Sequence, residues 1–172
     1  KIPKPIIGFI GAISSYKLNL SLIKFLAEKK SNWSFVLIGP LGEGEKEVNI
    51  KKILELRNIY YLGPKPYDVL PSYLRYFDVC LLPNKLNEYT KNMFPMKFFE
   101  YLSAGKPIVA TELPSLSEFR EVFYSAKNQE EFLEYISRAI SENSPELTNK
   151  RIDISTKYTW ENHITEMSRI IE

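Results

Sequence analysis

The stretch Pro95-Met-Lys-Phe-Phe-Glu-Tyr-Leu-Ser-Ala-Gly-Lys-Pro-Ile-Val-Ala-Thr111 predicts a helix followed at once by a buried strand. Proline is favoured at the first position of a helix and glycine just past its end, so we expect the helix to run from Pro95 to Gly105. Three apolar residues at helical spacing mark its packing face: Phe98, Phe99 and Leu102. The apolar run from 106 to 111 then predicts the strand.

Two charged residues of this helix, Lys97 and Glu100, lie three positions apart and therefore share one face. A lysine in the first turn opposes the helix dipole, and Lys before Glu is the poorer order for a helical ion pair. A helix start with an added positive charge suits an anion, and a carboxylate one turn further in can accept two ribose hydroxyls. The pair suggests a pocket for a nucleoside diphosphate. The residues alone leave open a plain surface ion pair, worth less than about 1 kcal/mol.

Apolar runs alternate with helical patterns along the chain, which predicts an α/β fold: a Rossmann-like, doubly wound parallel sheet with helices on both faces. The expected strands are 6–11, 33–39, 58–63, 78–83, 106–111 and 122–124. The expected helices are 18–30, 48–56, 67–77, 95–105, 129–142 and 159–172, with a polar loop over 84–94. Such sheets bind ligands beyond the carboxyl ends of their strands, here at the loops after Gly11, Gly39, Gly63 and Pro83.

Composition narrows the function classes. The chain has 172 residues, enough for one domain with a core, and a net charge of +2 gives no broad nucleic-acid surface. Its one cysteine, Cys80, lies in an apolar run and is expected to be a buried thiol, consistent with a reducing, cytoplasmic setting. No apolar run approaches the ~20 residues needed to span a bilayer. The chain begins with Lys1 and runs at once into a strand, so we expect a piece of a longer polypeptide.

Catalytic and metal motifs are few. His163 is the only histidine, and we expect it to be solvated or packed rather than catalytic. Without a second His or Cys no zinc site can be built, and the scattered acidic residues suggest no other metal. The glycines match neither dinucleotide nor phosphate-loop fingerprints. Gly11-Ala12, however, ends the first strand, where backbone often approaches a phosphate.

Taken together, these segments resemble the C-terminal, donor-binding domain of a GT-B glycosyltransferase of family 4 (group 1), and are most similar to a bacterial branch that makes cell-surface polysaccharides of the teichuronic-acid type. The stretch from Pro95 carries the most specific part of the likeness, Lys-x-x-Glu-Tyr-Leu-x-Ala-Gly-Lys-Pro. The matching segments occur in family order: Phe9–Ile13, Trp33–Pro40, Asn58–Gly63, Leu70–Tyr73, Phe77–Pro83, Pro95–Thr111 and Tyr158–Glu161.

The resemblance implies a nucleotide-diphospho-sugar donor, UDP or GDP linked, and no cofactor or bound metal. Lys97 and Glu100 would be the catalytic residues: Glu100 holds the ribose hydroxyls and Lys97 lies beside the diphosphate. The remaining ligand-binding positions would be Asn92, the helix start at Pro95 and Met96, the first-strand end at Gly11 and Ala12, and Pro64 and Lys65, whose backbone groups face the base.

Two positions depart from the family pattern. Asn92 stands where the wider family often has a glutamate, and Ala12 where it often has an arginine. Both changes leave fewer charges for the diphosphate, so low affinity or turnover is expected. The branch that this chain resembles shares them.

The resemblance also implies a domain arrangement. Residues 1–172 would form a single Rossmann-like domain, with a C-terminal helix over 158–172, including Trp160, that crosses toward an absent N-terminal, acceptor-binding domain. The acceptor would be a polysaccharide or lipid-linked hydroxyl at the inner face of the cell membrane, with peripheral membrane association left open. The fragment alone should bind nucleotide without turnover.

Three other functions compete with a transferase. A non-catalytic nucleotide-sugar-binding or scaffold domain would explain Asn92 and Ala12. A sugar-nucleotide epimerase shares the two-domain Rossmann-like architecture but requires acid–base groups, of which the sequence near Lys97 offers few. A receiver-like or flavin-binding module would need paired acidic residues where this chain has Gly11-Ala12-Ile13-Ser14.

Overall fold

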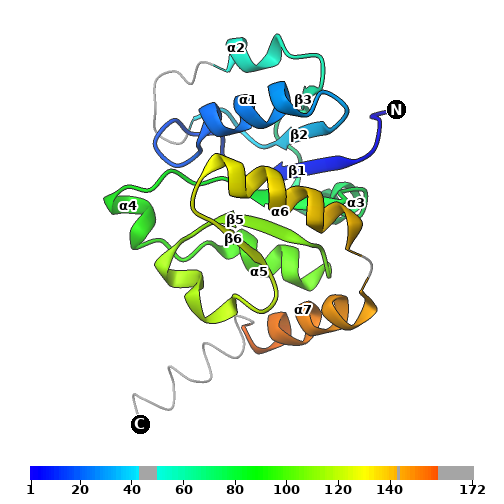
Figure 1. Cartoon of the computed structure of the whole chain (residues 1–172), viewed down its shortest axis with the longest axis vertical. Helices are drawn as coiled ribbons and strands as arrows, with labels where there is room; N and C mark the ends of the chain where they lie inside the picture. The colour runs from blue at the N-terminus through cyan, green and yellow to red at the C-terminus, as the bar shows by residue number, and fades with distance from the viewer. Residues whose placement is uncertain (43–49, 143, 159–172) are drawn as a thin grey trace.

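The fold is a six-stranded sheet in which all neighbouring strands are parallel (Figure 1). The computed structural model describes residues 1–42, 50–142 and 144–158. The strands are β1 (Ile6–Ile10), β2 (Ser34–Ile38), β3 (Ile59–Tyr61), β4 (Val79–Leu82), β5 (Ile108–Thr111) and β6 (Tyr124–Ala126). Their order in space, β3-β2-β1-β4-β5-β6, is that of a doubly wound sheet, which confirms the predicted fold class.

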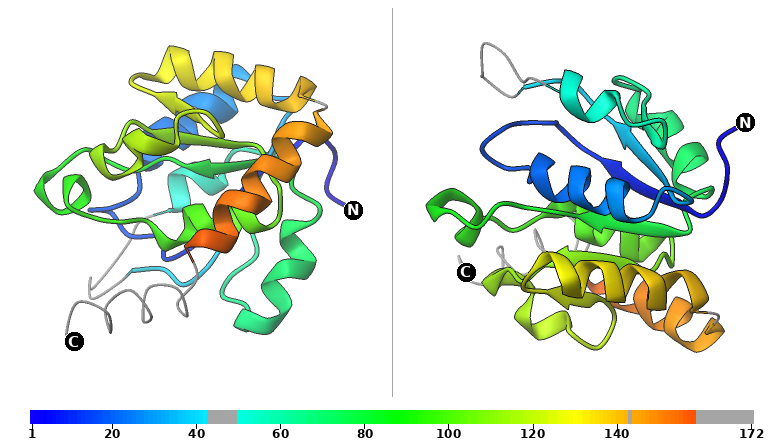
Figure 2. Two further views of the ribbon diagram at one scale, coloured as in Figure 1. Left: turned by 90° about the horizontal axis from the view of Figure 1, so that it is seen from below. Right: turned by 45° about the horizontal axis from the view of Figure 1, so that its top comes forward.

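Helices cover both faces of the sheet (Figure 2). One layer contains α1 (Leu20–Lys29), α2 (Lys51–Leu54) and α6 (Gln129–Ser141). The other contains α3 (Leu70–Leu74), α5 (Met96–Ser103) and α7 (Pro145–Lys157). Two 3₁₀ turns, η1 (Tyr67–Val69) and η2 (Pro114–Phe119), complete the second layer, and α4 (Glu88–Lys91) extends from the carboxyl edge of the sheet (Figure 1).

Alternate strand residues supply the two cores, because successive side chains of a strand point to opposite faces. Ile7 and Phe9 of β1 pack with the α1–α6 layer, whereas Ile6 and Ile10 pack with the α5 layer. Cys80 of β4 is fully buried in the second core, and burial raises the pKa of its thiol. The prediction of a buried core cysteine is therefore confirmed.

Side-chain caps define where three of the long helices begin. The N-cap side chains each accept a backbone N–H from within the first turn, which satisfies one of the donors left over at a helix start. The pairs are Asn19 with Leu22, Asn128 with Glu131 and Ser144 with Leu147.

Several predicted boundaries were wrong. The helix expected over 67–77 is η1 followed by the single turn of α3, with a proline near its start, and part of the loop over 84–94 is α4. The last strand runs over Tyr124–Ala126 instead of 122–124. α7 was missed because its sequence is mostly polar. The predicted helix over 159–172, with Trp160 and His163, lies outside the described residues.

Gly8 of β1 leaves space for a ring of the second core. A Cβ at this position would lie 2.0 Å from the Phe77 ring. Because Phe77 is itself buried, we expect Gly8→Ala to lower the free energy of unfolding by about 1–3 kcal/mol, measured by urea denaturation. Phe77→Leu should relieve the clash, so the double variant should lose less stability than the sum of the single variants; additive losses would contradict the contact.

Candidate functional site

The loops after β1 and β4 are joined at the point where the strand order reverses. Asn19 N donates to Pro83 O at 2.8 Å, and Lys85 N donates to Lys17 O at 2.8 Å. In open α/β sheets, ligands bind outside the carboxyl ends of the strands at this switch point. The two hydrogen bonds therefore hold these two loops together at the edge of the sheet where a ligand is expected to bind.

The neighbouring loops after β1 and β2 approach each other so closely that Gly39 has no room for a side chain. A Cβ at Gly39 would lie 1.9 Å from Gly11 O, and Gly39 has φ +147°. Gly11 N also donates to Ile38 O at 2.9 Å. Gly11 and Ala12 thus lie at the predicted edge, both half-buried.

Helix α5 is attached to the end of β1 through Tyr101. Ile10 N donates to the buried Tyr101 hydroxyl at 2.8 Å, and this hydroxyl donates to Ile10 O at 3.4 Å. Burial raises the pKa of Tyr101, so the hydroxyl keeps its proton.

Helix α5 ends as predicted, with Gly105 in the left-handed region at φ +65°. Pro95, in contrast, is the N-cap rather than the first helical residue.

Lys97 and Glu100 form the ion pair that their spacing predicts. Lys97 Nζ lies 2.7 Å from Glu100 Oε2 and 2.9 Å from Oε1. Their side chains are 28% and 33% exposed, so the pair is only partly screened by water. The same Nζ lies 5.5 Å from the centre of the Tyr67 ring, within range of a cation–π interaction.

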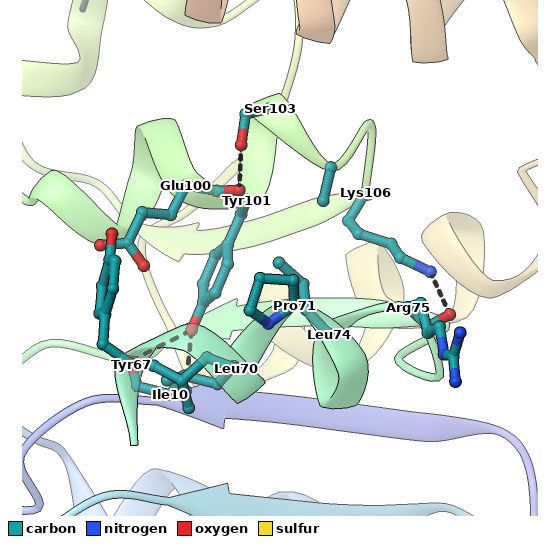
Figure 3. A pocket seen from close by; sticks show the side chains of 11 residues that line it. Ile10, Tyr67, Leu70, Pro71, Leu74, Arg75, Glu100, Tyr101, Ser103 and Lys106 are labelled. Atoms are coloured by element: carbon teal, nitrogen blue, oxygen red, sulfur yellow. Dashed lines mark hydrogen bonds between the residues drawn. The ribbon is translucent and has the colours of Figure 1, made fainter. Parts of the chain in front are cut away.

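A cavity of about 520 Å³ opens beside this ion pair, between α5 and the η1–α3 segment (Figure 3). Glu100 and Tyr67 lie at one end and Arg75 and Lys106 at the other. The remaining lining is mostly apolar: Ile10, Leu70, Pro71, Leu74, Tyr101, Ser103 and Ala104. A largely apolar slot with a few polar groups at its ends is the usual form of a small-molecule site.

Lys106 closes the far end of the cavity. Its Nζ donates to Arg75 O at 2.7 Å and to Phe77 O at 2.8 Å. Partial burial lowers the pKa of Lys106. This lysine is therefore held by the carbonyls that end α3, and it braces the wall of the cavity.

The other predicted ligand-binding positions are not gathered around this cavity. Pro64 and Lys65 follow β3 but do not line it, and Lys65 Nζ lies 6.0 Å from the Tyr73 ring centre. Asn92 is the C-cap of α4, and its Nδ2 donates to Glu88 O at 2.8 Å. Met96 is exposed at the start of α5.

Sequence reasoning missed Tyr67, Arg75 and the anchoring role of Tyr101. Tyr101 stands inside the quoted stretch, directly after Glu100, so its position beside the site could have been predicted. Tyr67 and Arg75 carry no comparable signal, because they line the cavity only through the approach of the η1–α3 segment to α5.

Within 1–42, 50–142 and 144–158, no group of three or more His, Cys, Asp or Glu side chains is arranged to hold a metal ion. None of the helices in those ranges is both long and apolar enough to cross a bilayer.

The sheet order and the loop connections at the switch point define a Rossmann-like domain, and the charged pair beside an apolar cavity marks its candidate ligand site. Comparison with known proteins gives the family. The model of the family described as "Glycosyl transferases group 1" matches residues 4–142. The chain belongs to this glycosyltransferase family.

Individual relatives agree with this assignment. The chain is 36% identical over 118 residues to TuaH of Bacillus subtilis (strain 168), a putative teichuronic acid biosynthesis glycosyltransferase. Among solved structures, it superimposes on Anabaena HepE, crystallised with UDP and glucose, with a TM-score of 0.77 at 16% identity. It superimposes on S. aureus TarM, crystallised with UDP and α-GlcNAc-glycerol among its ligands, with a TM-score of 0.73 at 17% identity. At these identities, the structures show the shared fold of GT-B glycosyltransferases.

The chain spans only part of each of these proteins. The match to TuaH covers 69% of this chain and 29% of TuaH. The superpositions cover 96% of this chain in both cases, but 48% of HepE and 35% of TarM.

Proposed function

We propose that this chain binds a nucleotide-diphospho-sugar, UDP or GDP linked, as the donor half of a glycosyltransferase. The protein containing it would transfer the glycosyl group to a hydroxyl of a polysaccharide or lipid-linked acceptor. The observation that carries the proposal is the position of Glu100 at the mouth of an apolar cavity, paired with Lys97 in the first turn of α5.

The parts of a nucleotide match the parts of the site. In this proposal the base lies in the apolar slot between α3 and α5, which Pro64 and Lys65 do not line, and the Glu100 carboxylate accepts the two ribose hydroxyls. The diphosphate then lies at the start of α5, where the helix dipole and the Lys97 ammonium favour negative charge. Gly11 and Ala12 form the neighbouring edge.

The groups that bind the diphosphate would also favour transfer of the glycosyl group. As the bond between the anomeric carbon and the diphosphate oxygen breaks, negative charge builds up on the departing diphosphate. Lys97 and the α5 amides stabilise that charge in place, which lowers the barrier. The acceptor and any base that removes its proton belong to parts of the protein outside this chain, so the chain alone should bind donor without turning it over.

The relatives support this proposal. HepE was crystallised with UDP and glucose and TarM with UDP, and TuaH is described as a glycosyltransferase of teichuronic acid biosynthesis. A cell-envelope polysaccharide is accordingly the proposed product class.

Calorimetric titration of the chain with UDP, GDP and uridine tests the proposal. We expect saturable binding of one nucleoside diphosphate, with uridine weaker than UDP because it lacks the diphosphate. Binding of none of the three would overturn the proposed function.

Lys97→Met separates the contribution of the diphosphate from that of the nucleoside. We expect UDP binding to weaken by about 1.5 kcal/mol, or tenfold, because a charge-assisted contact is lost. Uridine binding should change much less. Lys91→Met, which removes an exposed lysine of α4, is the matched control and should leave both affinities unchanged. Equal losses for UDP and uridine would show that Lys97 acts on Glu100 and not on the diphosphate.

A further inference from the structure

A single ammonium engages both oxygens of the carboxylate to which the ribose is assigned. Lys97 Nζ lies 2.7 Å from Glu100 Oε2 and 2.9 Å from Oε1, so two of its three donors are spent on one carboxylate. Two neighbouring hydroxyls of a ribose would bind a carboxylate in the same two-pronged way. Lys97 and the ribose therefore compete for the same pair of oxygens.

The position of Lys97 makes this ion pair easy to break. Lys97 lies in the first turn of α5, where a cation opposes the helix dipole, and Lys before Glu is the weaker order for a helical pair. Both side chains are also partly exposed, so a ligand can reach them. A pair of this kind shifts the balance between paired and separated side chains only a few-fold.

A diphosphate at the start of α5 would offer Lys97 a stronger partner than Glu100. It carries more negative charge than a single carboxylate, and the attraction between charges grows in proportion. The first turn of α5 contains no acidic residue that would repel it. An anion bound there would therefore draw the ammonium away from Glu100.

Tyr67 gives Lys97 a second contact that does not involve the carboxylate. The centre of its ring lies 5.5 Å from Lys97 Nζ, within the range of a cation–π interaction. The ring stands at the start of η1 and is exposed. The lysine thus keeps a partner beside the site when it leaves Glu100.

We propose that Lys97 is a specificity-determining residue that couples the two halves of the donor nucleotide. While Lys97 is paired with Glu100, the carboxylate accepts a ribose poorly; when a diphosphate draws the ammonium away, both oxygens become free for the hydroxyls. Each half of the ligand strengthens the binding of the other by the same factor, because binding free energies are linked. This role rests on the proposed function, which assigns the ribose to Glu100 and the diphosphate to the start of α5.

The coupling makes the site selective for a complete nucleoside diphosphate. A nucleoside alone must displace Lys97 without giving it a new anion, and pyrophosphate alone must leave Glu100 without its cation. An intact nucleoside diphosphate breaks the pair once and satisfies both groups. The gain is limited to what the pair itself contributes, so we expect a coupling of about threefold.

The test measures the two halves of the ligand separately and together. 5′-Deoxyuridine lacks the hydroxyl that would collide with a free pyrophosphate, and 5′-deoxyguanosine replaces it if GDP is the diphosphate that binds. We expect the dissociation constant of the 5′-deoxynucleoside, measured by NMR titration of the ¹⁵N-labelled chain, to fall about threefold at saturating inorganic pyrophosphate. Sodium chloride keeps the ionic strength equal in the two titrations, because salt screens charged contacts. An unchanged or higher dissociation constant would overturn the proposal.

Lys97→Met identifies the origin of the coupling. Without the ammonium, saturating pyrophosphate should no longer tighten nucleoside binding, and the nucleoside alone should bind up to about threefold more tightly because Glu100 is free. Lys91→Met removes a lysine that pairs with Glu88 at the same spacing on α4, and it should keep the full coupling. Coupling that persists in Lys97→Met would come from contact between the two ligands and would contradict the proposal. Lys97→Gln, which keeps a polar side chain at this partly exposed position, repeats the measurement if Lys97→Met loses stability.

Titration of the unchanged chain with UDP and GDP separates this proposal from the proposed function. Binding of one diphosphate without coupling between its halves removes the role of Lys97 and leaves the donor site intact. Binding of neither overturns the proposed function and the coupling with it.

Discussion

Replacing Glu100 with alanine is expected to weaken UDP binding by about 2.7 kcal/mol, or 100-fold. The variant removes the carboxylate that would accept both ribose hydroxyls. This loss occurs in a site that is about two-thirds shielded from solvent, where charge-assisted hydrogen bonds are stronger than on the surface. Calorimetric titration of the two proteins measures the difference.

Glu88→Ala is the matched control for this prediction. Glu88 lies on α4 at the same edge of the sheet and also pairs with a lysine, Lys91, but its side chain is 89% exposed. We expect UDP affinity within twofold of the unchanged chain. An equally small effect of Glu100→Ala would contradict the ribose contact.

The largest stability effect is expected at Arg151 of α7. Its side chain is 2% exposed, and its guanidinium donates to the Glu142 carboxylate at 2.6 and 3.0 Å and to Val122 O at 2.9 Å. Arg151→Met should lower the free energy of unfolding by about 3–5 kcal/mol, because Glu142 keeps a mostly buried charge without its partner. Urea denaturation followed by circular dichroism measures this loss.

A double variant identifies the cause of that loss. In Arg151→Met with Glu142→Leu, both charges are gone, so much of the stability should return. Lys150→Met serves as the surface control, because its pair with Glu121 is exposed on both sides and should contribute less than about 1 kcal/mol. If the double variant is no more stable than Arg151→Met, lost packing rather than an unpaired carboxylate explains the effect.

The fold could be predicted from the sequence because both signals behind it are local. Strands such as β2 and β4 are continuous apolar runs, and helices such as α1 and α6 carry an apolar stripe with an asparagine cap. The prediction was wrong where tertiary packing overrides local pattern. α7 has a polar sequence and is held by α5 and by the buried Arg151, which no periodicity reveals.

The candidate site, like the fold, could be predicted from the sequence only in part. Lys97 and Glu100 were predictable, because helical spacing alone decides that they meet. The cavity wall was not, since Tyr67 and Arg75 line the same cavity as Glu100 only after two separate segments come together. The roles assigned to Gly11, Ala12, Pro64, Lys65, Asn92, Pro95 and Met96 came from a family likeness, and they stay predictions until a nucleotide complex is measured.

The bonded loops at the strand reversal have a consequence for how a ligand enters. Pro83 and Lys85 are bonded to the loop after β1, and Tyr101 ties α5 to the end of the same strand, so these segments form one stiff unit next to the cavity. Tyr67, in contrast, is 72% exposed and its ring lies near Lys97 Nζ, so an entering ligand can displace this side chain. Association should accordingly be quick and governed by the swing of one aromatic ring, with no slow rearrangement of the sheet.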